Sequence, residues 1–203
     1  IKLKLEEHGL DKKVKLITHK PGDVVRAGCF TVEFIHVNHS IADAFMFAIK
    51  TPIGTIVHSG DFKIDYTPIN GEIMDLQRIA QIGREGVLLF VCESTNIEVP
   101  GFSKSERHVG ESISDMFKGA QGRIFVATFS SNVSRLQQIF TAAERHGRKV
   151  ALVGRSMLNV FNAANNLGYI QMKPDTLIEA NQVDKYPPEQ VVIISTGSQG
   201  EPM

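Results

Sequence analysis

VVIISTGSQGEP, residues 191–202, is the stretch that decides the fold. It begins as a charge-free run of Val and Ile, which is typical of a buried strand, and then breaks into Thr196 and Ser198. RIFVATFSSN (123–132) and KVALVGRSM (149–157) end in the same way, where a helix should begin. Such turns point backbone N–H groups and a helix dipole at one spot, which suits a phosphate. Ser, Thr and Gly also cap helices, so capping remains the alternative at each turn.

Composition describes a globular chain with balanced charge. The 203 residues, 42% of them hydrophobic, can bury a sizeable core. Lys plus Arg and Asp plus Glu are 22 each, which excludes the general basicity of a non-specific nucleic-acid binder. No run reaches the ~20 apolar residues of a membrane span. Cys29 and Cys92 lie in apolar patterns without CxxC spacing, which predicts buried free thiols and a cytoplasmic location.

The first part of the chain predicts an antiparallel sheet. Strand signals occur in VKLIT (14–18), CFTVEFIHV (29–37), AFMFAIKTP (44–52) and GTIVHSG (54–60). The alternation of residue types in the second of these is typical of a half-buried antiparallel strand.

From residue 72 onward, helices and apolar strands alternate, and this pattern predicts a parallel sheet covered on both faces. A helix is expected from 72 to 83. The further expected elements are helices over 103–118, 131–146 and 155–167 and strands over 87–92, 123–129, 149–153 and 191–195. Ser103 and Glu106 predict a capping box, and Met116 is expected on the buried face of its helix. The predicted class is therefore α/β, with an antiparallel first part.

His39 and Asp61 are candidate metal ligands. Each follows an expected strand, and imidazole and carboxylate are the ligand types that hold Zn or Mn, with Asp able to bridge two ions. Spacing alone does not make a metal motif, and on that basis a turn-capping Asp61 and an ordinary His39 are the favoured alternative.

Glu93 follows the strand GVLLFVC, which we expect to be buried. A carboxylate at the carboxyl end of a parallel strand lies where open α/β sheets place their ligands. Proton transfer or the orientation of a metal ligand is therefore one interpretation, and capping of the next turn is the other.

The sequence resembles the β-CASP branch of the metallo-β-lactamase superfamily, and within it the ribonuclease J family. The resemblance covers essentially the whole chain and rests on long segments in the right order. They are NHSIADA (38–44), HSGDFKIDYTP (58–68), ESTN (93–96), SERHVGESI (105–113), ATFSSNVSRLQQ (127–138), GRKVALVGRSM (147–157) and STGSQGEPM (195–203).

The resemblance implies a domain organisation and roles for the candidates. Residues 1–100 would be the later part of a metallo-β-lactamase αββα domain, and 101–203 an incomplete, Rossmann-like β-CASP domain. His39 matches a histidine metal ligand, Asp61 the aspartate that bridges two metals, and Glu93 the acidic residue of the first β-CASP motif. Ser131 matches a serine near the pocket for an RNA phosphate, and the expected phosphate-binding set is completed by Ser130, Asn132, Thr196 and Ser198.

For the full-length protein the resemblance implies a metal-dependent ribonuclease that acts on single-stranded RNA, from a 5′-monophosphate end and internally. It implies two divalent ions, Zn or Mn, and a homo-oligomer. The family's HxHxDH motif and its last ligand motifs are absent from this sequence, so we expect residues 1–203 alone to be inactive and to bind no metal tightly. A non-catalytic RNA- or phosphate-binding module is the alternative, and a domain that binds a sugar phosphate is a third.

Overall fold

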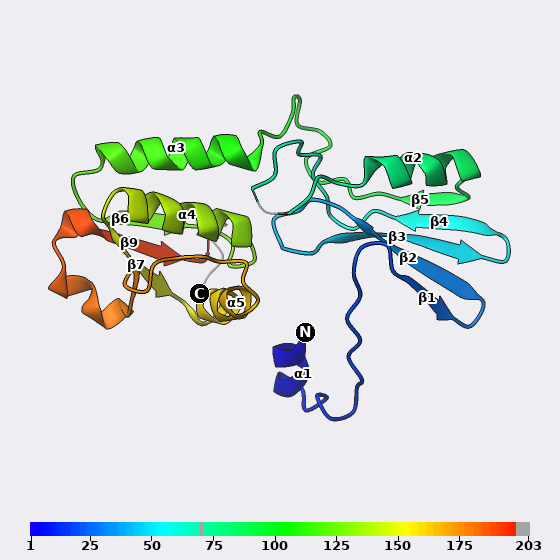
Figure 1. Ribbon diagram of the computed structural model, residues 1–203, viewed down its shortest axis with the longest axis horizontal. Helices are drawn as coiled ribbons and strands as arrows, with labels where there is room; N and C mark the ends of the chain where they lie inside the picture. The colour runs from blue at the N-terminus through cyan, green and yellow to red at the C-terminus, as the bar shows by residue number, and fades with distance from the viewer. Residues whose placement is uncertain (70, 198–203) are drawn as a thin grey trace.

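The computed structural model describes residues 1–69 and 71–197 and contains two sheets, one in each half of the chain (Figure 1). The first has the order β1-β2-β3-β4-β5. Its strands are β1 (Val24–Ala27), β2 (Phe30–His36), β3 (Phe45–Thr51), β4 (Gly54–His58) and β5 (Leu89–Val91). β1 to β4 pair antiparallel, as the sequence predicts, and β5 adds to β4 in parallel.

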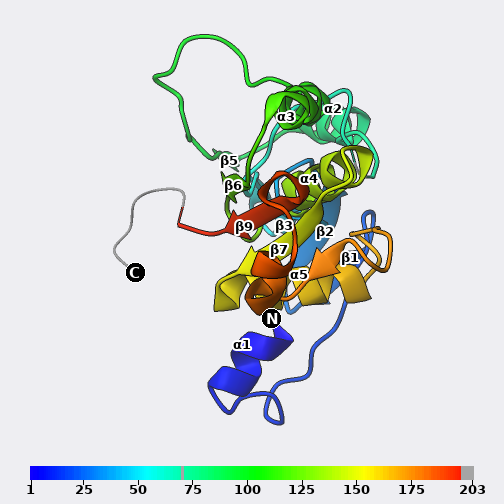
Figure 2. The same ribbon diagram turned by 90° about the vertical axis from the view of Figure 1, so that its left-hand side faces the viewer.

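Helix α2 (Leu76–Glu85) covers one face of this sheet (Figure 1). Its Ile82 joins the core that Ile35, Met46 and Val57 provide from the strands. The helix begins at Asp75, whose side chain accepts from the N–H of Arg78. A second helix in this half, α1 (Lys2–Glu7), lies apart from both sheets in the two ribbon views (Figures 1 and 2).

The second sheet is wholly parallel and has the order β6-β9-β7-β8. Its strands are β6 (Ile124–Ala127), β7 (Lys149–Val153), β8 (Leu177–Ile178) and β9 (Val191–Ser195), and its helices are α3 (Glu106–Gly119), α4 (Val133–Arg145) and α5 (Arg155–Asn166). Two 3-10 helices, η1 (Ala180–Lys185) and η2 (Pro188–Gln190), precede β9.

Both faces of this second sheet are covered, which explains its continuous apolar strands. Val192 and Ile194 of β9 pack with the three α-helices, whereas Val191 packs with Val183 of η1 on the opposite face. Helix α4 supplies the centre of the larger core, with Leu136, Ile139, Phe140 and Ala143 fully buried. The α/β class predicted from the sequence is therefore confirmed, and residues 191–195 form a strand with the predicted bounds.

Several local predictions are wrong. VKLIT (14–18) forms no strand. Helix α3 is capped by Ser105 rather than Ser103, because the hydroxyl of Ser105 accepts from the N–H of Arg107. Met116 is 65% exposed, because Ile113 and Phe117 are the residues that face the core.

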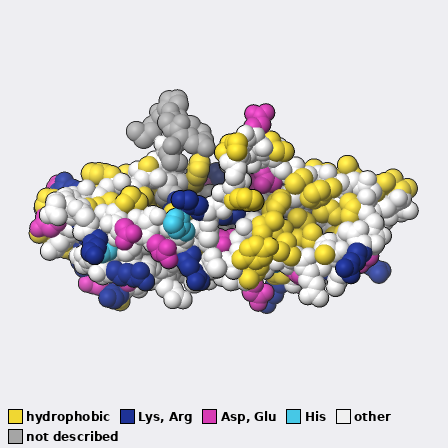
Figure 3. All heavy atoms as spheres, turned by 90° about the horizontal axis from the view of Figure 1, so that it is seen from above, with side chains coloured by type: hydrophobic (Ala, Val, Ile, Leu, Met, Phe, Trp, Pro, Cys, Tyr) yellow, Lys and Arg dark blue, Asp and Glu magenta, His cyan; other side chains and the backbone are white. Residues whose placement is uncertain are grey.

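Both cysteines are free but exposed, so the prediction of burial is wrong. Cys29 lies in the turn between β1 and β2, and Cys92 directly follows β5. β5 itself is exposed at all three positions, contrary to the expected buried strand, and it forms one edge of the described sheet. The exposed apolar residues in and next to β5 are Val87, Leu88, Leu89, Phe90 and Val91. Figure 3 shows a broad hydrophobic area on the face of the molecule that it presents. Within the described ranges, no helix is long and apolar enough to span a membrane.

Candidate functional site

His39, Asp61 and Glu93 line one cavity of about 730 Å³, called here the His39 cavity. Each follows a different strand of the first sheet, after β2, β4 and β5 respectively. These three strands run in the same direction, because β3 pairs antiparallel with both β2 and β4 whereas β5 is parallel to β4. Their loops therefore leave the same edge of the sheet, which brings residues that are distant in sequence into one cavity.

The turn that carries Asp61 requires glycine at position 60. Gly60 has a φ of +59°, and a Cβ atom there would lie 2.8 Å from the carbonyl oxygen of Phe45. Its N–H donates to Nδ1 of His58 over 3.0 Å. The HSGD segment is therefore a fixed turn at the end of β4, and it delivers Asp61 to the cavity wall.

Ser59 joins this turn to the loop of Glu93. It is buried, its hydroxyl donates to the carbonyl of Gly60 over 2.6 Å, and its oxygen accepts from the N–H of Glu93 over 3.0 Å. The carboxylate of Glu93 accepts from the N–H of Thr95 over 2.7 Å. Glu93 therefore caps its own turn and lines the cavity as well, so the two interpretations of this residue are compatible.

The loop of His39 is held by Asn38, which the sequence analysis did not identify. Its side-chain oxygen accepts from the N–H of Met74 over 2.9 Å, and its amide donates to the carbonyl of Glu72 over 2.8 Å. The backbone carbonyl of Asn38 accepts from the N–H of Lys63 over 2.7 Å. The loops after β2 and β4 are thus fastened to each other next to the cavity.

The donor types in the His39 cavity suit a divalent metal, but the set is incomplete. In residues 1–69 and 71–197, no group of three or more His, Cys, Asp and Glu side chains is placed to hold a metal ion. His39 and Asp61 alone are fewer than the three protein ligands of a typical catalytic zinc site. The described residues therefore do not form a metal site by themselves.

Lys63 is a further charged residue that sequence reasoning missed. It lines the His39 cavity, and its Nζ lies 3.8 Å from the carboxylate of Asp65 and 3.6 Å from that of Glu106. The signal was available in FKID, where a basic and an acidic residue follow Asp61 closely. These ion pairs reach from the first sheet's loops to the start of α3.

Asp65 is the centre of this junction between the two halves. It is 5% exposed, and it accepts from the N–H groups of Thr67 and Glu106, each over 2.9 Å. Burial would raise the pKa of Asp65, but these two backbone hydrogen bonds, with Lys63 nearby, hold it below its ordinary value. Glu106 in turn pairs with Arg135 of α4 over 3.1 Å.

A second contact across the junction joins Tyr169, which follows α5, to Asp43 beside the His39 loop. The hydrogen bond from the phenol to the carboxylate of Asp43 raises the pKa of Tyr169 to about 12. The protonated phenol therefore remains the donor throughout the physiological pH range.

The predicted phosphate-binding turns lie side by side at the carboxyl edge of the second sheet. Ala127, Val153 and Ser195 end their strands in one register. Ser130 and Ser156, from the turns after β6 and β7, are joined by a hydrogen bond of 2.8 Å. The ends of these strands therefore lie together at one edge of the sheet.

The candidate phosphate-binding residues at this edge differ in their exposure and in their hydrogen bonds. Asn132 caps α4, since its side chain accepts from the N–H of Arg135 over 3.0 Å, and it is almost buried. Ser130 and Ser131 are half-buried, Thr196 is exposed, and Ser198 lies outside the described residues. None of the four described candidates lines the His39 cavity. The structure therefore separates the predicted metal and phosphate residues into two groups.

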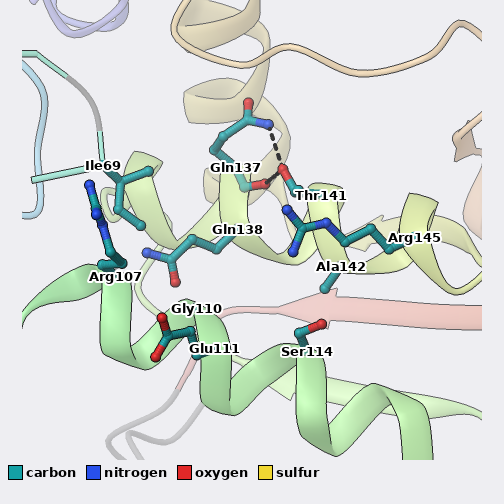
Figure 4. Close-up of a pocket in the computed structure, with 10 residues that line it drawn as sticks. All are labelled: Ile69, Arg107, Gly110, Glu111, Ser114, Gln137, Gln138, Thr141, Ala142 and Arg145. Atoms are coloured by element: carbon teal, nitrogen blue, oxygen red, sulfur yellow. Dashed lines mark hydrogen bonds between the residues drawn. The ribbon is translucent and has the colours of Figure 1, made fainter.

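A second hollow, separate from the His39 cavity, lies between α3 and α4 and has a volume of about 320 Å³ (Figure 4). Its walls carry Arg107, Glu111 and Ser114 from α3 and Gln137 and Arg145 from α4. Ile69 closes the end next to the junction. The sequence analysis did not predict this α3–α4 groove.

Comparison with known proteins shows which sequences the chain is similar to. Residues 121–203 match the family described as "Ribonuclease J, beta-CASP domain". The chain is 48% identical to a ribonuclease J of Synechocystis sp. and 46% identical to one of Thermus thermophilus, over 98% of its length in both cases. It covers 31% and 35% of those proteins, so it spans about a third of the length of these curated relatives.

A more distant structural likeness agrees on the fold. A crystal structure of a protein of unknown function from Enterococcus faecalis V583 matches with a TM-score of 0.62 and 19% identity, over 91% of this chain and 45% of that one. Along nearly all of its residues the chain is therefore similar to ribonucleases J, and it corresponds to a segment of about a third of the length of those relatives.

Proposed function

We propose that the full-length protein is a metal-dependent ribonuclease that degrades single-stranded RNA from a 5′-monophosphate end and also cuts it internally. The observation that carries the proposal is the convergence of His39, Asp61 and Glu93 on one cavity. The names of the relatives support a nuclease that processes RNA. A cytoplasmic location and a homo-oligomeric assembly are part of the same proposal.

Two divalent ions, Zn or Mn, complete the proposed site. His39 would bind one ion and Asp61 would bridge both, with the remaining ligands coming from parts of the full-length protein other than residues 1–203. Such ions, when bound, supply a nucleophile from water at neutral pH and stabilise charge on a phosphate. Residues 1–203 alone would then be inactive, because two ligands do not retain metal against water and buffer.

The other residues of the cavity would position and transfer protons. Glu93 holds the N–H of Thr95 with Oε2, so its other oxygen can orient a ligand or accept a proton. The turn of Ser130 and Ser131 and the residue Thr196 would hold the RNA backbone by hydroxyl and backbone N–H groups, together with Ser198, which lies outside the described residues.

Asn132→Asp tests whether the turn before α4 holds phosphate. The aspartate retains the acceptor for the N–H of Arg135 and suits the helix dipole, so stability should change by less than about 1 kcal/mol. A phosphate within about 4 Å would be repelled by about 1–4 kcal/mol, which weakens RNA binding at least about fivefold. Binding is measured by fluorescence anisotropy.

The reverse exchange at another cap, Asp75→Asn at the start of α2, is the matched control and should leave RNA affinity unchanged. Equal affinity of the Asn132→Asp variant and the natural protein would mean that this turn is a helix cap and nothing more.

The proposed activity is tested on the full-length protein with RNA that carries either a 5′-monophosphate or a 5′-hydroxyl group. With Mn or Zn added, we expect mononucleotides from the 5′ end of the monophosphorylated RNA and loss of cleavage with a chelator. The alternative is a non-catalytic RNA-binding module. RNA binding without cleavage under every metal condition would establish that alternative.

A further inference from the structure

The α3–α4 groove carries one arginine from each of its two helices. The two helices run parallel, since Glu106 pairs with Arg135 near their starts and Ser114 lies 3.4 Å from His146 further along. Arg107 lies at the start of α3, and the side chain of Arg145 is directed back along the groove towards Thr141 (Figure 4). The two guanidinium groups can therefore contact neighbouring phosphates of one chain.

The two carboxylates nearest the arginines have other partners. Glu106 pairs with Arg135, and Glu111, which lines the groove, lies 3.8 Å from His108. Arg107 and Arg145 are both exposed. Their guanidinium groups can therefore turn to a ligand in the groove without breaking a described ion pair.

The polar groups of α4 in the groove are hydrogen-bonded within the protein. Gln137, Thr141 and Ser114 line the groove (Figure 4). The amide of Gln137 donates to the hydroxyl of Thr141 over 3.1 Å and to the carbonyl of Gln171 over 2.9 Å, and the hydroxyl of Thr141 donates to the carbonyl of Gln137. The two arginines are therefore the donors that an anionic ligand in the groove would use.

A smaller hollow lies between the α3–α4 groove and the His39 cavity, and it shares lining residues with each of them. That intermediate hollow is lined by His39 and Lys63, which also line the His39 cavity, and by Ile69, which also lines the groove. The groove and the His39 cavity are therefore neighbours along the junction, with Lys63, Asp65 and Glu106 between them.

We infer that the α3–α4 groove binds the phosphodiester backbone of single-stranded RNA beyond the nucleotides that enter the His39 cavity, with Arg107 and Arg145 as phosphate contacts. The inference rests on the proposed function for the identity of the polyanion. A basic groove that follows the backbone is how single-stranded nucleic acids are held without regard to sequence.

The test compares a short and a long 5′-monophosphorylated RNA in the full-length protein, with a chelator present so that neither is cut. Arg107→Gln with Arg145→Gln removes two contacts while retaining helix-forming residues. For the long RNA, the plot of log affinity against log salt concentration should have a slope that is smaller in magnitude by about 1.4, as expected for two lost single-strand phosphate contacts. Affinity for the short RNA should not change.

The matched control, Arg26→Gln with Lys118→Gln, removes the same charge from exposed positions outside the groove and should leave the salt dependence unaltered. An opposite change gives a second test, because Glu111→Gln removes a negative charge from the groove and should tighten binding of the long RNA. If the groove variant and the control weaken binding equally, or if Glu111→Gln has no effect, the inference is wrong.

The same preparations separate this inference from the proposed function. If the short RNA is cleaved once metal is restored, but the affinity for the long RNA is the same with and without the two arginines, the groove inference is rejected and the proposed nuclease function is retained. Arginine-dependent binding of the long RNA without any cleavage would retain the groove and reject the nuclease.

Discussion

Asp61→Asn in the full-length protein is expected to lower RNA cleavage by more than about 100-fold, since even the loss of an outer-shell partner of a metal costs roughly 10–100-fold. The amide retains the shape of the carboxylate but not its negative charge, so it is a poor bridge between two cations. RNA binding in the absence of metal should be unchanged or slightly stronger. Metal content by mass spectrometry and single-turnover cleavage measure the two effects.

Asp115→Asn is the matched control for this prediction. Asp115 lies exposed on α3 and lines neither the His39 cavity nor the α3–α4 groove. It should retain full metal content and full cleavage. If Asp61→Asn binds as much metal and cleaves as fast as this control, Asp61 is not a ligand, and the capping alternative that the sequence left open would replace it.

The parts of the fold that the sequence predicts well are those whose burial is decided locally. Residues 191–194 are all apolar because helices lie on one face of their strand and η1 on the other. The spacing of Leu136, Ile139, Phe140 and Ala143 marks the buried face of α4 for the same reason. VKLIT carries a similar apolar signal but has no neighbouring strand in the described sheet to pair with, so the local pattern misleads.

The candidate site was predictable only in part, because its assembly depends on strand order. His39 and Asp61 share a cavity because β3 lies between β2 and β4, and no spacing in the sequence encodes that order. Their residue types and positions after expected strands made them candidates, the family resemblance favoured a role in metal binding, and that role stays a prediction. The α3–α4 groove was not predictable at all. It depends on which residues of two packed helices face each other, and the sequence does not show that register.

Asp65→Ala is expected to destabilise the protein by about 3–5 kcal/mol, the typical cost of removing one partner from a buried, charged hydrogen-bond cluster. The change leaves the N–H groups of Thr67 and Glu106 without their acceptor and removes one of the two carboxylates that lie near Lys63 in the junction. The midpoint of urea unfolding and its slope measure the loss.

Asp175→Ala is the comparison, because Asp175 also pairs with a lysine, Lys149, over 2.8 Å, but its side chain is 78% exposed. Exposed pairs contribute little, so this variant should unfold close to the natural protein. A similar midpoint for the two variants would show that the junction at Asp65 does not depend on a buried carboxylate.

The effect of Asp65 should also depend on pH in one direction. Burial acts to raise its pKa, yet the hydrogen bonds from Glu106 and Thr67 outweigh burial and hold the folded-state pKa below the ordinary value of 3.8. The folded protein therefore favours the deprotonated form, and the stabilisation is complete well above about pH 4 and is lost as the pH falls towards the folded-state pKa. The difference in unfolding free energy between the natural protein and Asp65→Ala should be constant near neutral pH and shrink below about pH 4. A difference that instead grew on acidification would mean that Asp65 is protonated in the folded protein and acts there as a hydrogen-bond donor.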